Sequence, residues 1–307
     1  MTGEIFDVGI VGGGPAGLSA GIWSARYLHS VVLVDSGDPR NWETRAINGY
    51  LGLPTVRPAD LRARGRDECR EYGVTLHDGN VIRAERTADE VFELCLEGGG
   101  KRRARRLLLA IGFRDVWPDI PGLAPVYGAN AHVCPDCDGY EARGKRVVVI
   151  GNGRHAVSMA LNLTTWTRQI IICTNGRPAD LDDPEYCDKL DALAIPVRTE
   201  PVRQVCYDGH RINHVELADG SQLAAEKVFF SIGQYPADDL GVQLGCARDR
   251  GGHILVDEYY HTSVLHVYAA GDITPGPQLA INAAAEGAIA SLAIHKSLVP
   301  EGRKLTV

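Results

Sequence analysis

The chain has 307 residues, a length typical of about two domains. Hydrophobic residues make up 45% and charged residues 23%, as in globular proteins, and a net charge of -7 gives no electrostatic reason to expect nucleic acid or an anionic membrane as a partner. We find no signal-peptide pattern after Met1 and no apolar run of the roughly 18 residues that a membrane span needs, so we expect a cytoplasmic enzyme.

A dinucleotide-binding pattern opens the chain. It consists of a buried strand, the turn Gly12-Gly13-Gly14-Pro15-Ala16-Gly17, a helix and a second strand, over residues 5–11, 12–17, 18–28 and 31–35. Gly12 permits the tight turn, Gly14 lets the backbone approach a pyrophosphate, and Gly17 lets the helix pack on the strand. Asp35, at the end of the second strand, can bond a ribose hydroxyl. Together these elements predict a bound dinucleotide.

The next hundred residues complete the first domain. Residues 36–60 are irregular, and a helix is predicted over 61–72. Short strands at 74–76, 91–96 and 105–111 predict a small antiparallel layer, with Gly98-Gly99-Gly100 as a turn. The proline-rich stretch 117–122 is typical of a linker, so we predict a domain boundary after residue 115.

A second copy of the dinucleotide pattern follows, with lower fidelity. A strand at 146–150 leads into Gly151, Gly153 and Ala156, a helix to about residue 166 and a strand at 169–173. Ala156 stands where the first copy has its third glycine, and it still allows close packing. After further strands at 196–198, 212–217 and 227–232, the chain resumes the first domain. We therefore predict domains 1–115 with 245–307, and 116–244.

Two cysteines stand close together among eight. Cys134 and Cys137 are separated by two residues, whereas the other six are scattered singly, as reduced and often buried structural thiols are. In a cytosolic protein such a pair indicates redox or metal chemistry. His132 would add a third zinc ligand, but the usual fourth ligand is missing, so no metal is predicted.

Near the C-terminus a strand at 267–270 ends in Gly271-Asp272, and an alanine-rich helix is predicted over 278–298. An acid at the end of a strand beside a helix N-terminus can hold a ribitol hydroxyl. The alternative for Asp272 is an N-cap.

With these motifs in order, the chain resembles the low-molecular-weight thioredoxin reductase family over essentially its full length. Cys134-Pro135-Asp136-Cys137-Asp138-Gly139 is similar to the family's Cys-x-x-Cys-Asp-Gly, and Ala110-Ile111-Gly112 to its Ala-Thr-Gly. The resemblance implies an α/β fold with two Rossmann-like, three-layer ββα domains and a bound FAD. Its cofactor-binding positions are expected at Gly12, Gly14, Pro15, Ala16, Gly17, Asp35, Asn48, Ala110, Gly112, Gly271, Asp272, Gln278, Leu279 and Ala280.

The resemblance also implies roles for the reactive pair. Cys137 would lie against the flavin and take its electrons, Cys134 would attack the disulfide of a partner, and Asp138 would supply or accept a proton. The partner would be thioredoxin or a thioredoxin-like protein, and the enzyme would be a homodimer. In relatives the second domain rotates during turnover, and the sequence leaves open whether this chain does the same.

The second nucleotide site departs from the family. No acids follow Ala156 in the helix, and a single Arg177 stands where NADPH-dependent members carry a His-Arg-Arg cluster. In the first domain, residues 38–45 replace the family's Gly-Gly-Gln-Leu stretch. These departures resemble members that do not use pyridine nucleotides: some take electrons from ferredoxin, and others oxidise dithiols with oxygen.

Three functions are therefore open. The first is a flavin-dependent disulfide reductase whose donor is not NADPH, and Asp138 favours it because the dithiol oxidases usually have His there. The second is a dithiol oxidase that uses oxygen. The third, from another class, is a flavin-binding redox sensor, against which the intact cysteine pair argues.

Overall fold

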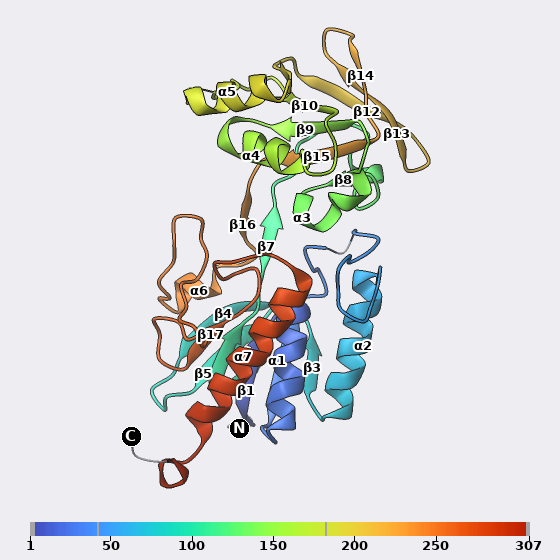
Figure 1. Ribbon diagram of the computed structural model, residues 1–307. Helices are drawn as coiled ribbons and strands as arrows, with labels where there is room; N and C mark the ends of the chain where they lie inside the picture. The colour runs from blue at the N-terminus through green and yellow to red at the C-terminus, as the bar shows by residue number, and fades with distance from the viewer. Residues whose placement is uncertain (1–3, 42, 182, 305–307) are drawn as a thin grey trace. The chain divides into compact units, whose positions relative to one another are not determined.

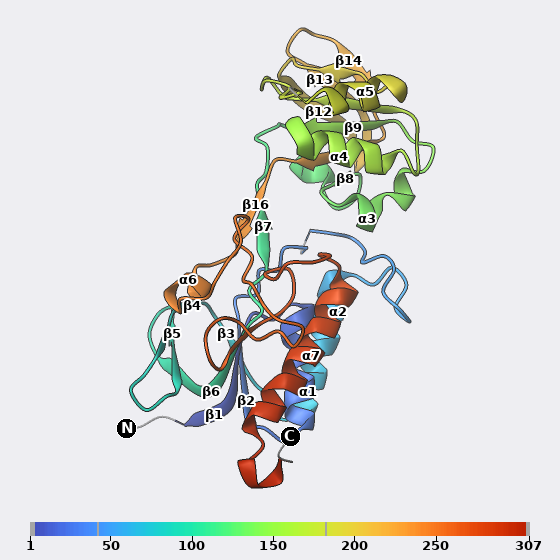
Figure 2. The ribbon, with the colours of Figure 1, turned by 60° about the vertical axis from the view of Figure 1, so that its left-hand side comes forward.

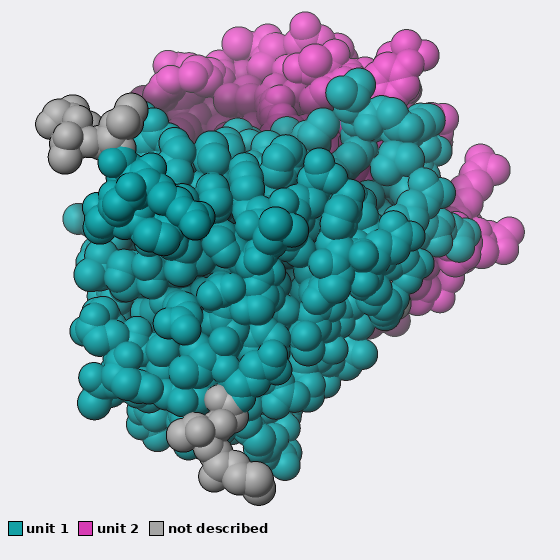
Figure 3. Space-filling model, turned by 90° about the horizontal axis from the view of Figure 1, so that it is seen from below, with its two compact units in different colours: residues 1–42, 50–114, 235–307 teal, residues 43–49, 115–234 magenta. Residues whose placement is uncertain are grey.

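The computed structural model describes residues 4–41, 43–181 and 183–304. Trp42, inside the loop at 38–45, lies outside the described residues. The chain forms two compact units, coloured separately in Figure 3: unit 1 comprises residues 1–42, 50–114 and 235–307, and unit 2 comprises 43–49 and 115–234. The predicted domain boundaries stay a prediction; the contacts group residues 43–49 with unit 2 and residues 235–244 with unit 1.

Unit 1 is built on a seven-stranded sheet in the order β3-β2-β1-β6-β5-β4, with β17 paired to β6. Its strands are β1 (Ile5–Val11), β2 (Val31–Asp35), β3 (Thr75–Asp78), β4 (Val81–Arg86), β5 (Phe92–Leu96), β6 (Lys101–Leu109) and β17 (Val267–Ala269). β6 joins the parallel and antiparallel parts of the sheet, because it pairs in parallel with β1 and β17 and antiparallel with β5.

One part of the strand prediction was wrong. The strand near residue 75 does not belong to the antiparallel layer, since β3 pairs in parallel with β2. The antiparallel layer is instead β4, β5 and β6, and β4 escaped prediction because its exposed face carries Arg83 and Glu85 between few apolar residues.

Three long helices lie side by side along one face of this sheet (Figure 1): α1 (Pro15–Arg26), α2 (Pro58–Glu71) and α7 (Ala280–Leu298). α1 and α7 approach closely, because a Cβ on Gly287 would come within 2.0 Å of the Ala16 carbonyl oxygen. One apolar core fills the space between helices and sheet, around Ile10, Leu33 and Tyr268, and a second lies on the opposite face around Phe92 and Leu107.

The remaining elements of unit 1 are short: the helix α6 (Leu240–Gln243) and the 3-10 turn η3 (Glu301–Arg303). β7 (Phe113–Asp115) pairs with β16 (Gln234–Pro236), and these two strands carry the chain out of unit 1 and back.

Unit 2 contains a parallel sheet in the order β11-β10-β9-β15-β8 and an antiparallel sheet of β12, β13 and β14. The strands are β8 (Ala131–His132), β9 (Val147–Gly151), β10 (Ile170–Cys173), β11 (Val197–Arg198), β12 (Val202–Asp208), β13 (Arg211–Leu217), β14 (Gln222–Ala224) and β15 (Lys227–Ser231). The helices are α3 (Pro135–Asp138), α4 (Gly153–Leu163) and α5 (Pro184–Ala192), with 3-10 turns η1 (Ala124–Val126) and η2 (Tyr140–Ala142).

Both units have the same three layers. In unit 2, α4 and α5 pack on one face of the parallel sheet through a core around Val149 and Leu163, and β12 and β13 cover the other face around Val148 and Val215 (Figure 2). This ββα layering, with helices on one face of a parallel sheet and an antiparallel layer on the other, confirms the predicted pair of Rossmann-like domains. Among the described residues no helix is long and apolar enough to cross a membrane.

Candidate active site

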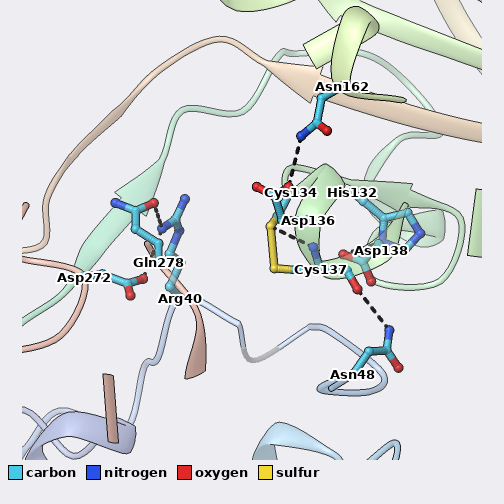
Figure 4. The surroundings of a disulfide bond; sticks show 10 residues. All are labelled: Arg40, Asn48, His132, Cys134, Asp136, Cys137, Asp138, Asn162, Asp272 and Gln278. Carbon is cyan, nitrogen blue, oxygen red and sulfur yellow. Dashed lines mark hydrogen bonds and ion pairs between the residues drawn. A yellow bond between two sulfur atoms is a disulfide. The ribbon is translucent and has the colours of Figure 1, made fainter. Parts of the chain in front are cut away.

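Cys134 and Cys137 form a disulfide whose Cα atoms are 5.3 Å apart. Cys134 is the extended residue that caps the short helix α3, and Pro135 occupies the first helical position, where its missing N–H costs nothing. The Cys137 backbone N–H points at the Cys134 sulfur, with the nitrogen 3.1 Å from Sγ (Figure 4). A donor aimed at Sγ favours the charged thiolate once the disulfide is reduced, so the local fold supports Cys134 as the nucleophile.

The turn after the pair is fixed by close packing. A Cβ on Gly139 would lie 2.4 Å from the ring of Trp166, so this position excludes any larger residue. The Asn162 side chain on α4 donates to the Asp136 carboxylate over 3.0 Å. These contacts hold α3 against α4 and leave little freedom in the backbone that carries the two sulfurs.

Two further side chains approach the pair in unit 2. The Asn48 amide donates to the Cys137 carbonyl oxygen over 3.3 Å, and the His132 Nδ1 lies 3.3 Å from the Asp138 Oδ2 (Figure 4). Asn48 was expected at the cofactor, and that role stays a prediction; in this structure its partner is the backbone of the disulfide turn. Asp138 is the carboxylate expected to exchange a proton with the pair.

The first glycine turn of unit 1 has the shape of a phosphate cradle. Gly12 has φ of +105°, and a Cβ there would lie 2.2 Å from the Ala110 oxygen, while a Cβ on Gly17 would lie 1.9 Å from the Gly12 oxygen. Gly14 differs from both, because nothing lies within 4 Å of its Cβ position. The open space at Gly14, directly before Pro15 and Ala16 at the start of α1, fits the approach of a pyrophosphate to a helix N-terminus.

Asp35 lies buried at the end of β2, where two arginines of α2 meet its carboxylate. Arg66 contacts Oδ2 over 3.1 Å, and Arg62 bonds to the same oxygen. The buried Nε of Arg62 has no hydrogen-bond partner among the described residues. Gly13 allows this arrangement, since a Cβ there would lie 2.2 Å from the Asp35 carboxyl. A buried donor left without a partner is what a bound polar ligand would satisfy, and the ribose contact of Asp35 stays a prediction.

The C-terminal motif of unit 1 is held by a buried carboxylate that the sequence did not single out. Glu286 on α7 accepts from the Gly271 backbone N–H over 2.6 Å and from the Thr274 hydroxyl over 3.1 Å. The Asn282 amide donates to its other oxygen over 2.7 Å. Burial raises the pKa of Glu286. The signal for Glu286 was weak, because a single acid in an alanine-rich helix is ordinarily solvent-facing.

Asp272 itself is paired with an arginine from the loop after β2. Arg40 donates from Nη1 to Asp272 over 3.1 Å and to the Gln278 oxygen over 2.7 Å (Figure 4). Asp272 does not cap α7, whose N-cap is Leu279, directly before Ala280. Ala110 directly follows β6 and donates its N–H to the Val11 carbonyl, and Gly112 has φ of +69°. All these residues belong to unit 1, and their contacts with a cofactor stay predictions.

The second glycine turn, in unit 2, meets a loop of its own chain. The Gly153 N–H donates to the Ala179 carbonyl over 2.9 Å, and the Asn152 amide donates to the Asp180 carboxylate over 2.6 Å. Gly151 and Ala156 pack together, with a Cβ on Gly151 3.3 Å from that of Ala156. A backbone carbonyl and a carboxylate therefore sit at the N-terminus of α4, where a nucleotide fold would place a pyrophosphate.

One group of metal-ligand side chains occurs among the described residues, away from the disulfide. Cys206 on β12 lies opposite His214 on β13, and Glu216 is next on the same face, with ligand atoms within 4.8 Å of one another. The carboxylate of Glu216 already accepts from Arg203 and Gln204. Sequence spacing did not show this group because its members come from two strands.

Comparison with known proteins identifies the family. Residues 6–287 match the model of the pyridine nucleotide-disulphide oxidoreductases. The chain is 30% identical over 282 residues to the thioredoxin reductase tcpT of Claviceps purpurea, covering 88% of this chain and 87% of that protein. Among solved structures, HlmI superposes with a TM-score of 0.91 at 34% identity over 97% of this chain and 94% of HlmI. The putative thioredoxin reductase TrxB of Bacillus anthracis gives 0.88 at 28% identity over 95% and 98%.

The open cradle at Gly14 and the partnerless Arg62 Nε fit the FAD that members of this family bind. The disulfide between Cys134 and Cys137 fits their chemistry. The chain therefore belongs to the thioredoxin reductase family of pyridine nucleotide-disulphide oxidoreductases, as an FAD-dependent flavoprotein disulfide oxidoreductase.

Proposed function

We propose that the protein reduces the disulfide of thioredoxin or a thioredoxin-like protein, and that its electron donor is not NADPH but a protein donor such as reduced ferredoxin. The observation that carries the donor part is the occupied N-terminus of α4. The Ala179 carbonyl accepts a hydrogen bond from the Gly153 N–H, and the Asp180 carboxylate accepts one from the neighbouring Asn152 amide. Because both groups are electron-rich, a dinucleotide pyrophosphate would have to displace them and overcome charge repulsion.

The loop that carries Ala179 and Asp180 is anchored at its base. The Asn175 side chain accepts from the Val202 N–H over 2.8 Å, and the Thr174 hydroxyl donates to the Arg177 carbonyl over 2.6 Å. These bonds tie the start of the segment after β10 to β12 and to itself, and Ala179 and Asp180 follow within a few residues. The segment also lacks the basic cluster that binds a 2′-phosphate, which supports the same conclusion.

The proposed reaction is thiol–disulfide exchange. The Cys134–Cys137 disulfide takes up two electrons and two protons to become two thiols; a bound FAD, once reduced by the donor, would supply the two electrons. The Cys134 thiolate attacks one sulfur of the partner's disulfide and releases the other as a thiol. Cys137 then attacks the mixed disulfide, which frees the second partner thiol and restores the bond to Cys134. Asp138 exchanges the protons that these steps release and consume.

The donor is tested by anaerobic stopped-flow absorbance on the FAD-loaded protein. NADPH, NADH and reduced ferredoxin are compared side by side. We expect only reduced ferredoxin to bleach the flavin absorbance on the time scale of turnover. Rapid bleaching by micromolar NADPH would refute the donor part. Thiol release from oxidised thioredoxin, measured in the same mixture, tests the acceptor.

A second candidate is a dithiol oxidase, in which the same residues run in reverse and oxygen takes the electrons. The occupied α4 N-terminus also supports this candidate, because such an enzyme needs no nucleotide. An oxygen electrode separates the two: oxygen uptake and peroxide release with a small dithiol favour the oxidase, and a flat trace removes it.

We also expect a cytoplasmic homodimer, on the resemblance of the chain to its family. Sedimentation of the FAD-loaded protein tests the dimer: a single species at the mass of one chain would contradict it. Fractionation of the producing cells tests the compartment.

A further inference from the structure

A lysine, a histidine and Asp138 form a buried row behind the disulfide in unit 2. The Lys227 Nζ lies 3.4 Å from the His132 Nε2, and the His132 Nδ1 lies 3.3 Å from the Asp138 Oδ2. Lys227 and His132 are 8% and 5% exposed, and the Asp138 side chain 13%. We propose that Lys227 and His132 are positioning residues that hold Asp138 as the proton-exchanging carboxylate of the Cys134–Cys137 pair. This inference rests on the proposed function of that pair.

The row is set by backbone pairing and by turn geometry. β8 and β15 run in parallel, with Phe229 beside His132, and Lys227 begins β15 two residues earlier. The Lys227 ammonium also donates to the Ala129 carbonyl over 3.0 Å, which anchors it at the base of β8. α3 follows β8 after two residues, so the same short segment delivers both His132 and Asp138.

Hydrogen-bond chemistry fixes the direction of the row. An ammonium is only a donor, so the His132 Nε2 that faces Lys227 must accept. In a neutral imidazole the proton then resides on Nδ1, which donates to Asp138. The lysine thus selects the histidine tautomer whose Nδ1–H donates to the charged form of the Asp138 carboxylate.

Charge balance supports the same assignment. The row contains one cation and one anion, and removal of either takes away the opposite charge nearest to the other inside the row. Burial lowers the pKa of Lys227, while the negative charges of Asp138 and Glu141 raise it and Lys145 lowers it. Asp136, a further charged group next to the pair, is bonded to Asn162 on α4.

The proton step that the row serves is simple. A thiol of the reduced pair gives its proton to Asp138, which leaves a thiolate and a carboxylic acid, and the proton returns when the partner's thiolate is released. A cation and a hydrogen-bond donor behind the carboxylate stabilise its charged form, which is the form that accepts the proton. Breaking the row should therefore move the acidic limb of the exchange reaction to higher pH.

The test uses a half-reaction that needs neither the donor nor the protein partner. The FAD-loaded protein is reduced with a phosphine, desalted and mixed anaerobically with an aromatic disulfide, and the released aromatic thiolate is followed between pH 4 and 9. A Cys187→Ser background removes the exposed thiol, and Cys134→Ser identifies the signal of the pair. We expect Lys227→Met and His132→Leu to shift the acidic limb upward by about one pH unit.

Matched variants separate positioning from mere packing. Lys227→Arg keeps the cation, and His132→Gln keeps an acceptor for Lys227 and a donor for Asp138, so both should restore most of the wild-type profile. Lys145→Met removes a lysine that is 47% exposed in its side chain and bonded to Glu226, and should leave the profile unchanged. In an Asp138→Asn background, Lys227→Met should add no further shift.

The outcomes are distinct. An unmoved acidic limb in folded Lys227→Met or His132→Leu overturns the proposal. An equal shift with Asp138→Asn present also overturns it, because Lys227 would then act on the thiols directly. If Lys227→Met does not fold, the His132→Leu and His132→Gln pair carries the test. Failure of thioredoxin reduction, with the expected profile intact, would refute the proposed function and leave the row in place.

Discussion

Gly14 and Gly17 lie in the same turn, yet an added methyl group should affect them differently. At Gly17 a Cβ would lie 1.9 Å from the Gly12 carbonyl oxygen, and the backbone on both sides prevents relief. We expect Gly17→Ala to lower the free energy of unfolding by about 3 kcal/mol, at the upper end of overpacking effects. At Gly14 nothing lies within 4 Å and φ is -77°, which any residue adopts. There the cost to folding should stay at or below about 1 kcal/mol.

The same methyl group at Gly14 would project into the cradle predicted for the FAD pyrophosphate. We expect Gly14→Ala to weaken FAD binding by about 100-fold, or roughly 3 kcal/mol. Urea unfolding of the cofactor-free proteins measures the first effect, and FAD titration followed by flavin fluorescence measures the second. Gly302→Ala, also in open space but on the 3-10 turn η3, is the matched control and should change neither. Wild-type FAD affinity in Gly14→Ala would refute the placement of the pyrophosphate.

Three further predictions concern single side chains. Glu286→Leu leaves the Gly271 N–H and the Thr274 hydroxyl without an acceptor and should lower the free energy of unfolding by about 2 to 4 kcal/mol in urea, whereas Glu286→Gln keeps an acceptor and should recover most of it. Burial raises the pKa of Asp238 to about 6 from 3.8, so the native state binds this proton more tightly than the unfolded chain does. The free energy of unfolding should therefore fall by up to about 3 kcal/mol as the pH rises from 4 to 6. Urea unfolding at the two pH values measures this difference, and Asp238→Asn should remove it. Cys134→Ser should abolish thiol release from every disulfide tried while the donor still bleaches the flavin; unchanged transfer would revive a sensor role.

The motifs that could be read from the sequence are those whose function depends on local backbone. The turn from Gly12 to Gly17 needs glycines at fixed offsets whatever surrounds it, and Cys134 and Cys137 are close enough to form a bond without help from the rest of the chain. Both motifs were therefore identified from the sequence, and the roles of their individual residues stay predictions. The strand β4 and the parallel pairing of β3 were not, because strand partners are chosen by packing over long sequence separations.

The contacts around the site depended on tertiary structure for the same reason. Lys227 is 95 residues from His132, and no periodicity connects them until β8 and β15 pair. The sequence showed that the second glycine turn lacks the residues that select a pyridine nucleotide. Only the folded loop shows that Ala179 and Asp180 accept hydrogen bonds from Gly153 and Asn152. Local spacing thus determined the redox pair and the cofactor fold, whereas burial and long-range pairing decided which charges face the pair and what occupies the second nucleotide turn.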